Sequence, residues 1–352
     1  MNLAQVLEEL IEERGIDRSV LSSIVSEGLL AAYQRKYPDL SFKTVYDPDT
    51  GSVKVFVKKL IVASAKDENA ELSLRKAKTI SPFAQEGEEI EVPFDGKIGR
   101  IEILRAKQVI ASRIREIEAS VVYSEFKNRE GEIVIGVVYK CERSGTVVKI
   151  DNTLAFLPKS LSVPGEKHVV GAPVRALLKE VLSEPRNDNQ LILDRSSEKF
   201  LQRLFELEVP EVFERLVEIK KVVRIAGYKS KIVVFSNDKN IDPVGTCVGV
   251  GGSRIRPVLK ELNGEKIDVI AYSSDLEEMV ASALKPAKVN RIVIEGFVAK
   301  VWLDDDQRSL AIGKMGQNIA LASKLVGYEI QLVSGASSAE TKALHDETFL
   351  HD

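Results

Sequence analysis

An internal repeat in the C-terminal half constrains this chain more than any other feature. The stretch "RIAGYKSKIVVFSND" (224–238) resembles "VIEGFVAKVWLDDD" (293–306), and each predicts two strands joined by a glycine–aromatic turn. Downstream, "CVGVGGSRIRPVLKELNGEKIDVI" (247–270) resembles "AIGKMGQNIALASKLVGYEIQLV" (311–333). Each copy therefore predicts the order strand, strand, short helix, G-x-x-G, helix, strand.

The two copies differ in length between their turns and their loops. Matched glycines lie 69 residues apart at the turns (Gly227 and Gly296) but 64 apart at the loops (Gly249 and Gly313). The first copy therefore carries five extra residues. We expect them in "KNIDP" (239–243).

Glycine loops of this kind raise two cofactor alternatives, and both fail on spacing. A dinucleotide-binding G-x-G-x-x-G that starts at Gly249 has Arg254 where the third glycine belongs. A P-loop around Gly313 and Lys314 lacks both the upstream glycine and the Ser or Thr after the lysine. We therefore predict no nucleotide cofactor.

Two G-x-x-G loops remain, each joining two predicted helices. Glycine has no Cβ, so phosphates can approach the main chain and the N–H groups of the following helix. One such loop is weak evidence, because glycine commonly ends a helix. Two loops in equivalent places of a repeat predict K-homology (KH) domains, whose loop clamps single-stranded RNA. The predicted RNA contacts in the loops and helix starts are Gly249, Val250, Gly251, Gly252, Ser253, Arg254, Arg256, Gly313, Lys314, Met315, Gly316, Gln317 and Asn318.

Positive charge is local rather than global. The formal net charge is −3, which argues against a uniformly basic binder. Residues 219–237 nevertheless contain five cations and no acid, and we expect Lys229 and Lys231 among them to contact RNA. An ordinary solvated strand pair is the alternative.

The region 128–197 predicts an all-β domain. Five short strand-like runs are separated by Gly, Pro and Asn clusters: "EIVIGVVYKC", "GTVVKI", "TLAFLP", "APVRALLKEV" and "NQLILDR". Five strands at this spacing predict a small OB-type barrel. Tyr139 and Phe156 are candidates for stacking on bases, although filling the barrel interior explains such side chains equally well.

The N-terminal part predicts an α+β domain. Apolar periodicity indicates helices at 3–11 and, after Asp17, at 20–33, followed by a hairpin at 42–57. A strand near 88–94 and a long helix at 101–126 complete it. Helices return at 198–219, with a break at Pro210.

Catalytic and metal-binding residues are scarce. The chain has three histidines and two cysteines, with no metal-ligand spacing and no material for a His-based triad. No apolar run is long enough to span a membrane. We expect a cytoplasmic protein that is not an enzyme.

Up to about residue 333 the chain resembles the NusA family of bacterial transcription elongation factors. The most specific stretches are "FELEVPE" (205–211), "GYKSKIVVFSND" (227–238), "DPVGTCVG" (242–249), "LNGEKIDV" (262–269) and "LAIGKMGQNIALAS" (310–323). The resemblance implies a multidomain α+β fold. Its expected parts are an N-terminal RNA polymerase-binding domain (1–127), an S-one-type OB barrel (128–197), two tandem KH domains (198–274 and 275–334) and a flexible tail (335–352).

The resemblance also implies partners and an activity. Expected partners are core RNA polymerase, nascent single-stranded RNA and other Nus-type antitermination factors, and we expect a monomer without cofactors. The implied activity is control of pausing, intrinsic termination and antitermination. The family usually has basic residues where this chain has Gly251 and Met315.

Two other classes carry similar modules. Phosphorolytic ribonucleases combine KH and S-one-type domains, but in the order KH then OB and behind large catalytic cores. A ribosome-associated RNA-binding protein would explain the KH pair but not the N-terminal domain. The domain order therefore favours the elongation factor.

Overall fold

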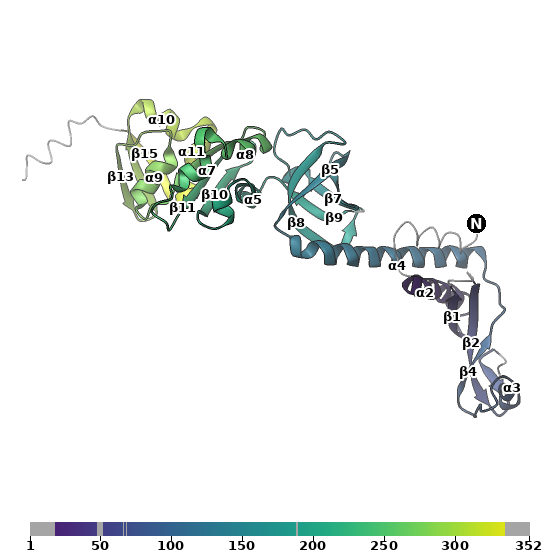
Figure 1. Ribbon diagram of the computed structural model, residues 1–352. Helices are drawn as coiled ribbons and strands as arrows, with labels where there is room; N and C mark the ends of the chain where they lie inside the picture. The colour runs from purple at the N-terminus through teal and green to yellow at the C-terminus, as the bar shows by residue number, and fades with distance from the viewer. Residues whose placement is uncertain (1–17, 48–51, 66, 68, 188, 335–352) are drawn as a thin grey trace, which may run out of the picture. The chain divides into compact units, whose positions relative to one another are not determined.

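A computed structural model describes residues 18–47, 52–65, 67, 69–187 and 189–334 (Figure 1). The chain divides after Val121 into two compact units. The predicted helix at 3–11 and the predicted tail at 335–352 lie outside the described residues. Within the described ranges, every helix is too short or too polar to cross a bilayer.

The first unit packs helices against a small mixed sheet. Its elements are α2 (Arg18–Lys36), β1 (Ser41–Asp47), β2 (Ser52–Val62), β3 (Glu71–Ser73), α3 (Leu74–Ile80), β4 (Glu89–Pro93) and α4 (Arg100–Phe126), which runs on into the second unit. Strand β2 pairs antiparallel with β1 and β4 and parallel with β3. The predicted hairpin, strand and two helices are confirmed, whereas the short β3 and α3 were not predicted.

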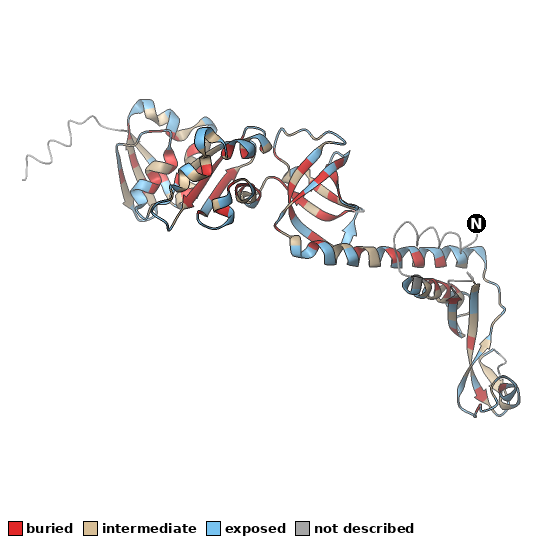
Figure 2. Ribbon diagram, viewed as in Figure 1, coloured by how far each residue is buried: buried red, intermediate tan, exposed pale blue. Residues whose placement is uncertain are grey.

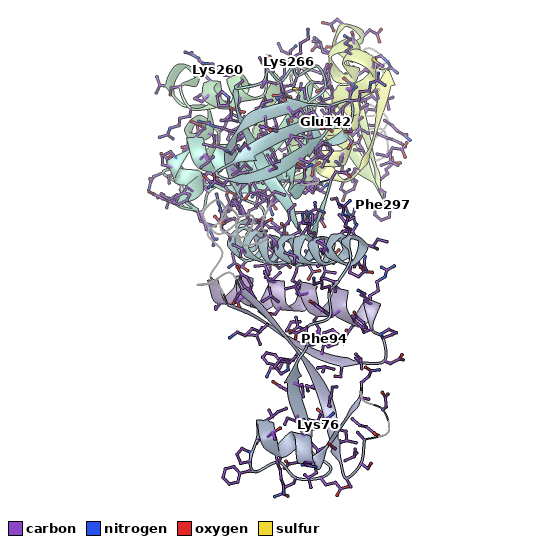
Figure 3. All side chains as sticks on the ribbon, turned by 90° about the vertical axis from the view of Figure 1, so that its right-hand side faces the viewer. Lys76, Phe94, Glu142, Lys260, Lys266 and Phe297 are labelled. Carbon is purple, nitrogen blue, oxygen red and sulfur yellow. The ribbon has the colours of Figure 1, made fainter. Side chains whose placement is uncertain are left out.

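Close contact between α2 and α4 builds the core of this unit. Ile24 and Val25 of α2 are buried against Ala106 and Ile110 of α4. Gly28 permits this approach, because a Cβ there would lie 2.5 Å from Cγ1 of Ile110. Aromatic rings extend the packing: Tyr33, Tyr37, Phe42 and Phe94, of which Figure 3 labels Phe94.

The second unit starts with a closed five-stranded barrel. Its strands are β5 (Ile133–Cys141), β6 (Gly145–Ile150), β7 (Thr153–Pro158), β8 (Pro173–Arg186) and β9 (Asn189–Asp194), and short 3-10 turns lie at η1 (Lys127–Arg129) and η2 (Lys159–Leu161). Their order around the barrel is β5-β6-β7-β9-β8. Closure rests on two parallel residue pairs between β7 and β9. Phe126 and the inward residues of every strand form the core of the barrel. Figure 2 shows buried positions along the barrel strands, and the predicted OB-type barrel is confirmed.

The two repeats follow the barrel. The first contains α5 (Glu198–Glu208), α6 (Pro210–Phe213), β10 (Glu218–Ile225), β11 (Lys229–Phe235), α7 (Pro243–Val248), η3 (Val250–Gly252), α8 (Ile255–Glu261) and β12 (Lys266–Ala271). The second contains α9 (Leu276–Leu284), β13 (Arg291–Glu295), β14 (Val298–Leu303), α10 (Asp305–Ile312), η4 (Lys314–Gly316), α11 (Gln317–Val326) and β15 (Glu329–Ser334).

Both repeats build the same sheet. The central strand pairs antiparallel with the strand before it and parallel with the strand after the helices. The extra residues of the first copy lie between β11 and α7, as expected, since Asp304 alone separates β14 from α10. Pro210 opens α6 at the predicted break, whereas α9 was not predicted.

The repeats share a core. One face of the first sheet packs on its own α5, α7 and α8. The opposite face, with Val223, Val233 and Ile270, packs on the helices of the second repeat. The corresponding face of the second sheet carries exposed Arg291 and Glu295 instead.

Candidate nucleic-acid interface

Both G-x-x-G loops have the same backbone conformation. The φ angles at positions one, three and four are 75°, 59° and 77° in Gly249, Gly251 and Gly252, and 71°, 54° and 72° in Gly313, Met315 and Gly316. These angles lie in the left-handed region that favours glycine. The sequence match between the copies therefore extends to the shape of the loops.

The first and last glycines of each loop have different roles. A Cβ on Gly249 would lie 2.6 Å from Oγ of Ser253, and a Cβ on Gly313 would lie 2.7 Å from Cβ of Asn318. At Gly316 a Cβ would meet nothing within 4 Å. The first glycine thus lets the loop approach the next helix, while the last leaves open space where a phosphate can reach the main chain.

The middle loop positions point into solvent. Val250 is 96% exposed and Met315 is 86% exposed. Lys314 is exposed and makes no ion pair among the described residues, so its ammonium group is available to a phosphate. The exposed Arg256 donates a hydrogen bond of 2.8 Å to the carbonyl of Gly251 and so carries its charge beside the loop.

The side chain of Arg254 is held in place by hydrogen bonds within the protein. Its guanidinium donates to the carbonyl of Thr246 and to Oε1 of Glu211, each at 2.9 Å. Burial alone would raise the pKa of Glu211, but its backbone hydrogen bond and Arg254 outweigh this effect and lower it. Arg254 therefore fixes the loop against α6 and offers a partly exposed charge.

A basic face was predicted at 219–237, but three of its five cations are buried or nearly buried and paired with acids. Lys231 is fully buried, and its Nζ lies 2.7 Å from Oδ2 of Asp268. Burial lowers the pKa of Lys231, and Asp268 opposes that shift. Lys229 is nearly buried and forms an ion pair with the same carboxylate. Arg224 is buried and forms an ion pair with Glu265. The prediction failed for Lys229 and Lys231 because the second repeat covers their face of the sheet.

Asn318 is also buried rather than exposed beside its loop. It is 4% exposed, and its side-chain amide donates to the carbonyls of Leu284, Leu310 and Ala311 at 3.1–3.3 Å. Its Oδ1 accepts a 3.1 Å hydrogen bond from Lys229 of the first repeat. Asn318 is thus a positioning residue that joins the second loop to both repeats.

The two barrel aromatics lie on the outer surface. Tyr139 is 59% exposed at a bulge of β5. Phe156 alternates along β7 with the buried Ala155 and Leu157, so it points outward, opposite Val147 of β6. Barrel filling is therefore wrong for both residues. Outward aromatics on these strands suit base stacking.

The exposed aromatic ring of Phe297 was not among the predicted contacts. Phe297 is 85% exposed in the turn between β13 and β14 (Figure 3). Its counterpart Tyr228 is partly buried. The repeated glycine–aromatic turn marked both positions, but this pattern does not indicate which of the two rings remains in solvent.

Comparisons with known proteins agree with this architecture. Family models match residues 2–120 as a NusA N-terminal domain, 195–272 as a NusA-like first KH domain and 276–340 as a NusA-like second KH domain. Relatives named transcription termination/antitermination protein NusA extend the match over nearly the whole chain. The Halalkalibacterium halodurans protein is 36% identical over 98% of this chain and 91% of its own length.

The chain belongs to the NusA family. The Bacillus subtilis NusA is 36% identical over 96% of this chain and 92% of its own length. The Thermus thermophilus NusA is 35% identical over 97% and 92%. The expected combination of a NusA N-terminal domain with two tandem KH domains is therefore confirmed.

Proposed function

We propose that this chain is an RNA-binding transcription elongation factor that modulates pausing, intrinsic termination and antitermination. The observation that carries the proposal is the matched conformation of two tandem G-x-x-G loops. The last glycine is little obstructed in either loop: a Cβ on Gly252 would meet only Cγ2 of Ile255 at 3.8 Å, and a Cβ on Gly316 would meet nothing within 4 Å. Two weak clamps on one core gain from effective concentration, so they can hold a single strand together.

The RNA contacts that we propose follow from exposure. They are the loop residues 249–253 and 313–317, with Arg254 and Arg256 supplying charge and Tyr139 and Phe156 stacking on bases. Lys229, Lys231 and Asn318 are left out because their side chains are buried or nearly buried, unlike that of Arg254.

The remaining parts of the proposal rest on family membership. The N-terminal domain (1–127) docks on core RNA polymerase, and the barrel (128–197) and KH domains (198–274 and 275–334) hold the emerging transcript. Other Nus-type factors join this complex in the cytoplasm. The chain acts as a monomer and without catalysis.

Aspartate at the last glycine of each loop tests RNA binding. Gly252→Asp and Gly316→Asp place a carboxylate where a phosphate must sit, so affinity for single-stranded RNA should fall at least tenfold. Gly264→Asp is the matched control, because Gly264 also has positive φ and open surroundings but lies beyond the far end of α8. Thermal melting should be alike for all three variants.

The salt dependence of RNA affinity is a second test, and it can contradict the proposal. With Z phosphates contacted, log affinity should fall with log salt at a slope of roughly −0.7Z. A slope near zero, or no binding at low salt, would contradict the RNA-clamp assignment.

Two further assays separate the alternatives. Co-purification with core polymerase distinguishes an elongation factor from a ribosome-associated protein. Incubation with labelled RNA, phosphate and magnesium tests for a phosphorolytic enzyme, and shortening of the RNA would overturn the proposal.

A further inference from the structure

A groove runs along the free edge of β10. Its cavity of about 790 Å³ is lined by every residue from Val217 to Val223. Alternate residues of a strand point to opposite faces, so a cavity that touches all of them lies along the edge of the strand. Strand β10 is an outer strand of its sheet, and its outward N–H and C=O groups face this groove without a partner strand.

The groove carries excess positive charge. Each of its three acids is already paired with a groove cation: Glu198 with Lys324 at 2.6 Å, Glu206 with Arg203 at 2.5 Å and Glu218 with Lys220 at 2.5 Å. Three other cations line the groove: Lys199, Arg215 and Lys221. None of the three makes an ion pair among the described residues, so the groove is basic within a chain whose net charge is −3.

The free edge of β10 and the positive charge around it favour binding of an acidic strand. A bulge after Ile219 and the lysines beside it are features that discourage an edge strand from pairing with other chains. A strand that carries carboxylates neutralises the lysines and so removes the charge part of this barrier. The described lining contains aliphatic side chains, such as Val212 and Ile219, but no aromatic ring on which a nucleic-acid base could stack. We propose that the β10 edge binds an extended acidic peptide segment of a partner protein as an additional strand.

Charges on both sides of the groove fit such a strand. Lys199 belongs to α5, which packs on one face of the first sheet, whereas Lys221 pairs in register with Val233 of the opposite face. Successive acidic side chains of an added strand point alternately to these two sides. The exposed Glu198–Lys324 pair joins α5 to α11 at the groove, and a peptide carboxylate can replace Glu198 in this weak contact.

Peptide binding to the full chain tests the proposal. The probe is a fluorescein-labelled eight-residue peptide in which Asp or Glu alternates with Val or Thr, followed by anisotropy at low ionic strength. Lys199→Ser and Lys221→Ser should each weaken binding about two- to fivefold, as expected for exposed ion pairs. Lys266→Ser is the matched control, since Lys266 is exposed on β12 at the opposite edge of the same sheet (Figure 3) and should leave affinity unchanged.

A second peptide separates strand pairing from charge attraction. Methylation of alternate backbone nitrogens removes the donors that face β10 but keeps every carboxylate, so affinity should be lost. Equal binding of the methylated peptide, or full affinity in both groove variants, would overturn the proposal. The same variants are also tested for binding to an eight-nucleotide single-stranded RNA. If the groove variants weaken RNA binding while the peptide does not bind, the groove is an RNA site and the proposal is wrong.

Discussion

At the scale of single residues, the two loops differ most informatively at their third position, which is glycine in the first loop and methionine in the second. Gly251 and Met315 share the left-handed conformation, but a side chain in that region costs about 1–2 kcal/mol. Met315→Gly should therefore raise the free energy of unfolding by about 1 kcal/mol, measured by denaturant titration. A decrease in stability would mean that the exposed methionine makes contacts that offset its backbone strain.

Charge at the same position should alter RNA affinity separately from stability. Met315→Lys keeps a side chain in the same backbone conformation and adds a cation beside Lys314, so stability should stay unchanged. Affinity for single-stranded RNA should rise, with the salt slope steeper by roughly 0.7. Gly251→Arg should show the same steepening but lose about 1 kcal/mol of stability. An unchanged slope in both variants would show that this position does not face a phosphate.

At the scale of elements, the orientation of the first loop depends on how α7 begins. Oδ1 of Asp242 accepts a 3.1 Å hydrogen bond from the backbone N–H of Val244, and Pro243 occupies the first helical position. Asp242→Ala should lower the free energy of unfolding by about 1 kcal/mol, measured by chemical denaturation. Asp242→Asn retains the acceptor and should stay near the wild type. Equal losses in both variants would assign the effect to charge rather than to capping.

At the scale of the whole second unit, ion pairs join the barrel to the first repeat. Arg195 is 2% exposed and binds Glu166 of the barrel together with Glu261 of α8. Nε2 of His168 lies 3.6 Å from Glu166. Burial lowers the pKa of His168, Glu166 opposes this shift, and the charge of Arg195 adds to it. The folded protein therefore takes up a proton at His168 less readily than the unfolded chain does.

This depressed pKa predicts acid sensitivity of the unit. The contribution of His168 to stability is present above its ordinary pKa of 6.5 and is lost as the pH falls below that value. His168→Gln should remove this part of the pH dependence, measured as the difference in unfolding midpoint between wild type and variant at mildly alkaline and mildly acidic pH. A constant difference across that range would show that His168 does not titrate on unfolding.

Local patterns were sufficient to predict most elements and the loops. The glycines at the first and last loop positions indicated the two left-handed turns, and strand alternation defines the barrel, but nothing in the sequence indicated that Met315 would be left-handed as well. Burial of Lys229 and Lys231 could not be predicted, because it depends on which face of the first sheet meets the second repeat. Strand β11 is buried on both faces, so its sequence does not show which face meets the second repeat. Strand β3 and helix α3 are too short to give a clear periodic signal.

The charged outer face of the second sheet acts as an end cap. In the first repeat the equivalent face carries Val223, Val233 and Ile270, and Lys229 and Lys231 on it pair with Asp268. On the second sheet the guanidinium of Arg291 lies 5.4 Å from the ring centroid of Trp302, and Lys300 pairs with Glu295 at 2.6 Å. A further repeat stacked on this face would have to strip water from these charges, which is strongly unfavourable. The second repeat therefore packs on the first but presents a charged face to any third repeat, as in solenoid proteins whose terminal repeats carry a polar outer surface. The pair can be joined tightly without offering an open end on which further copies polymerise.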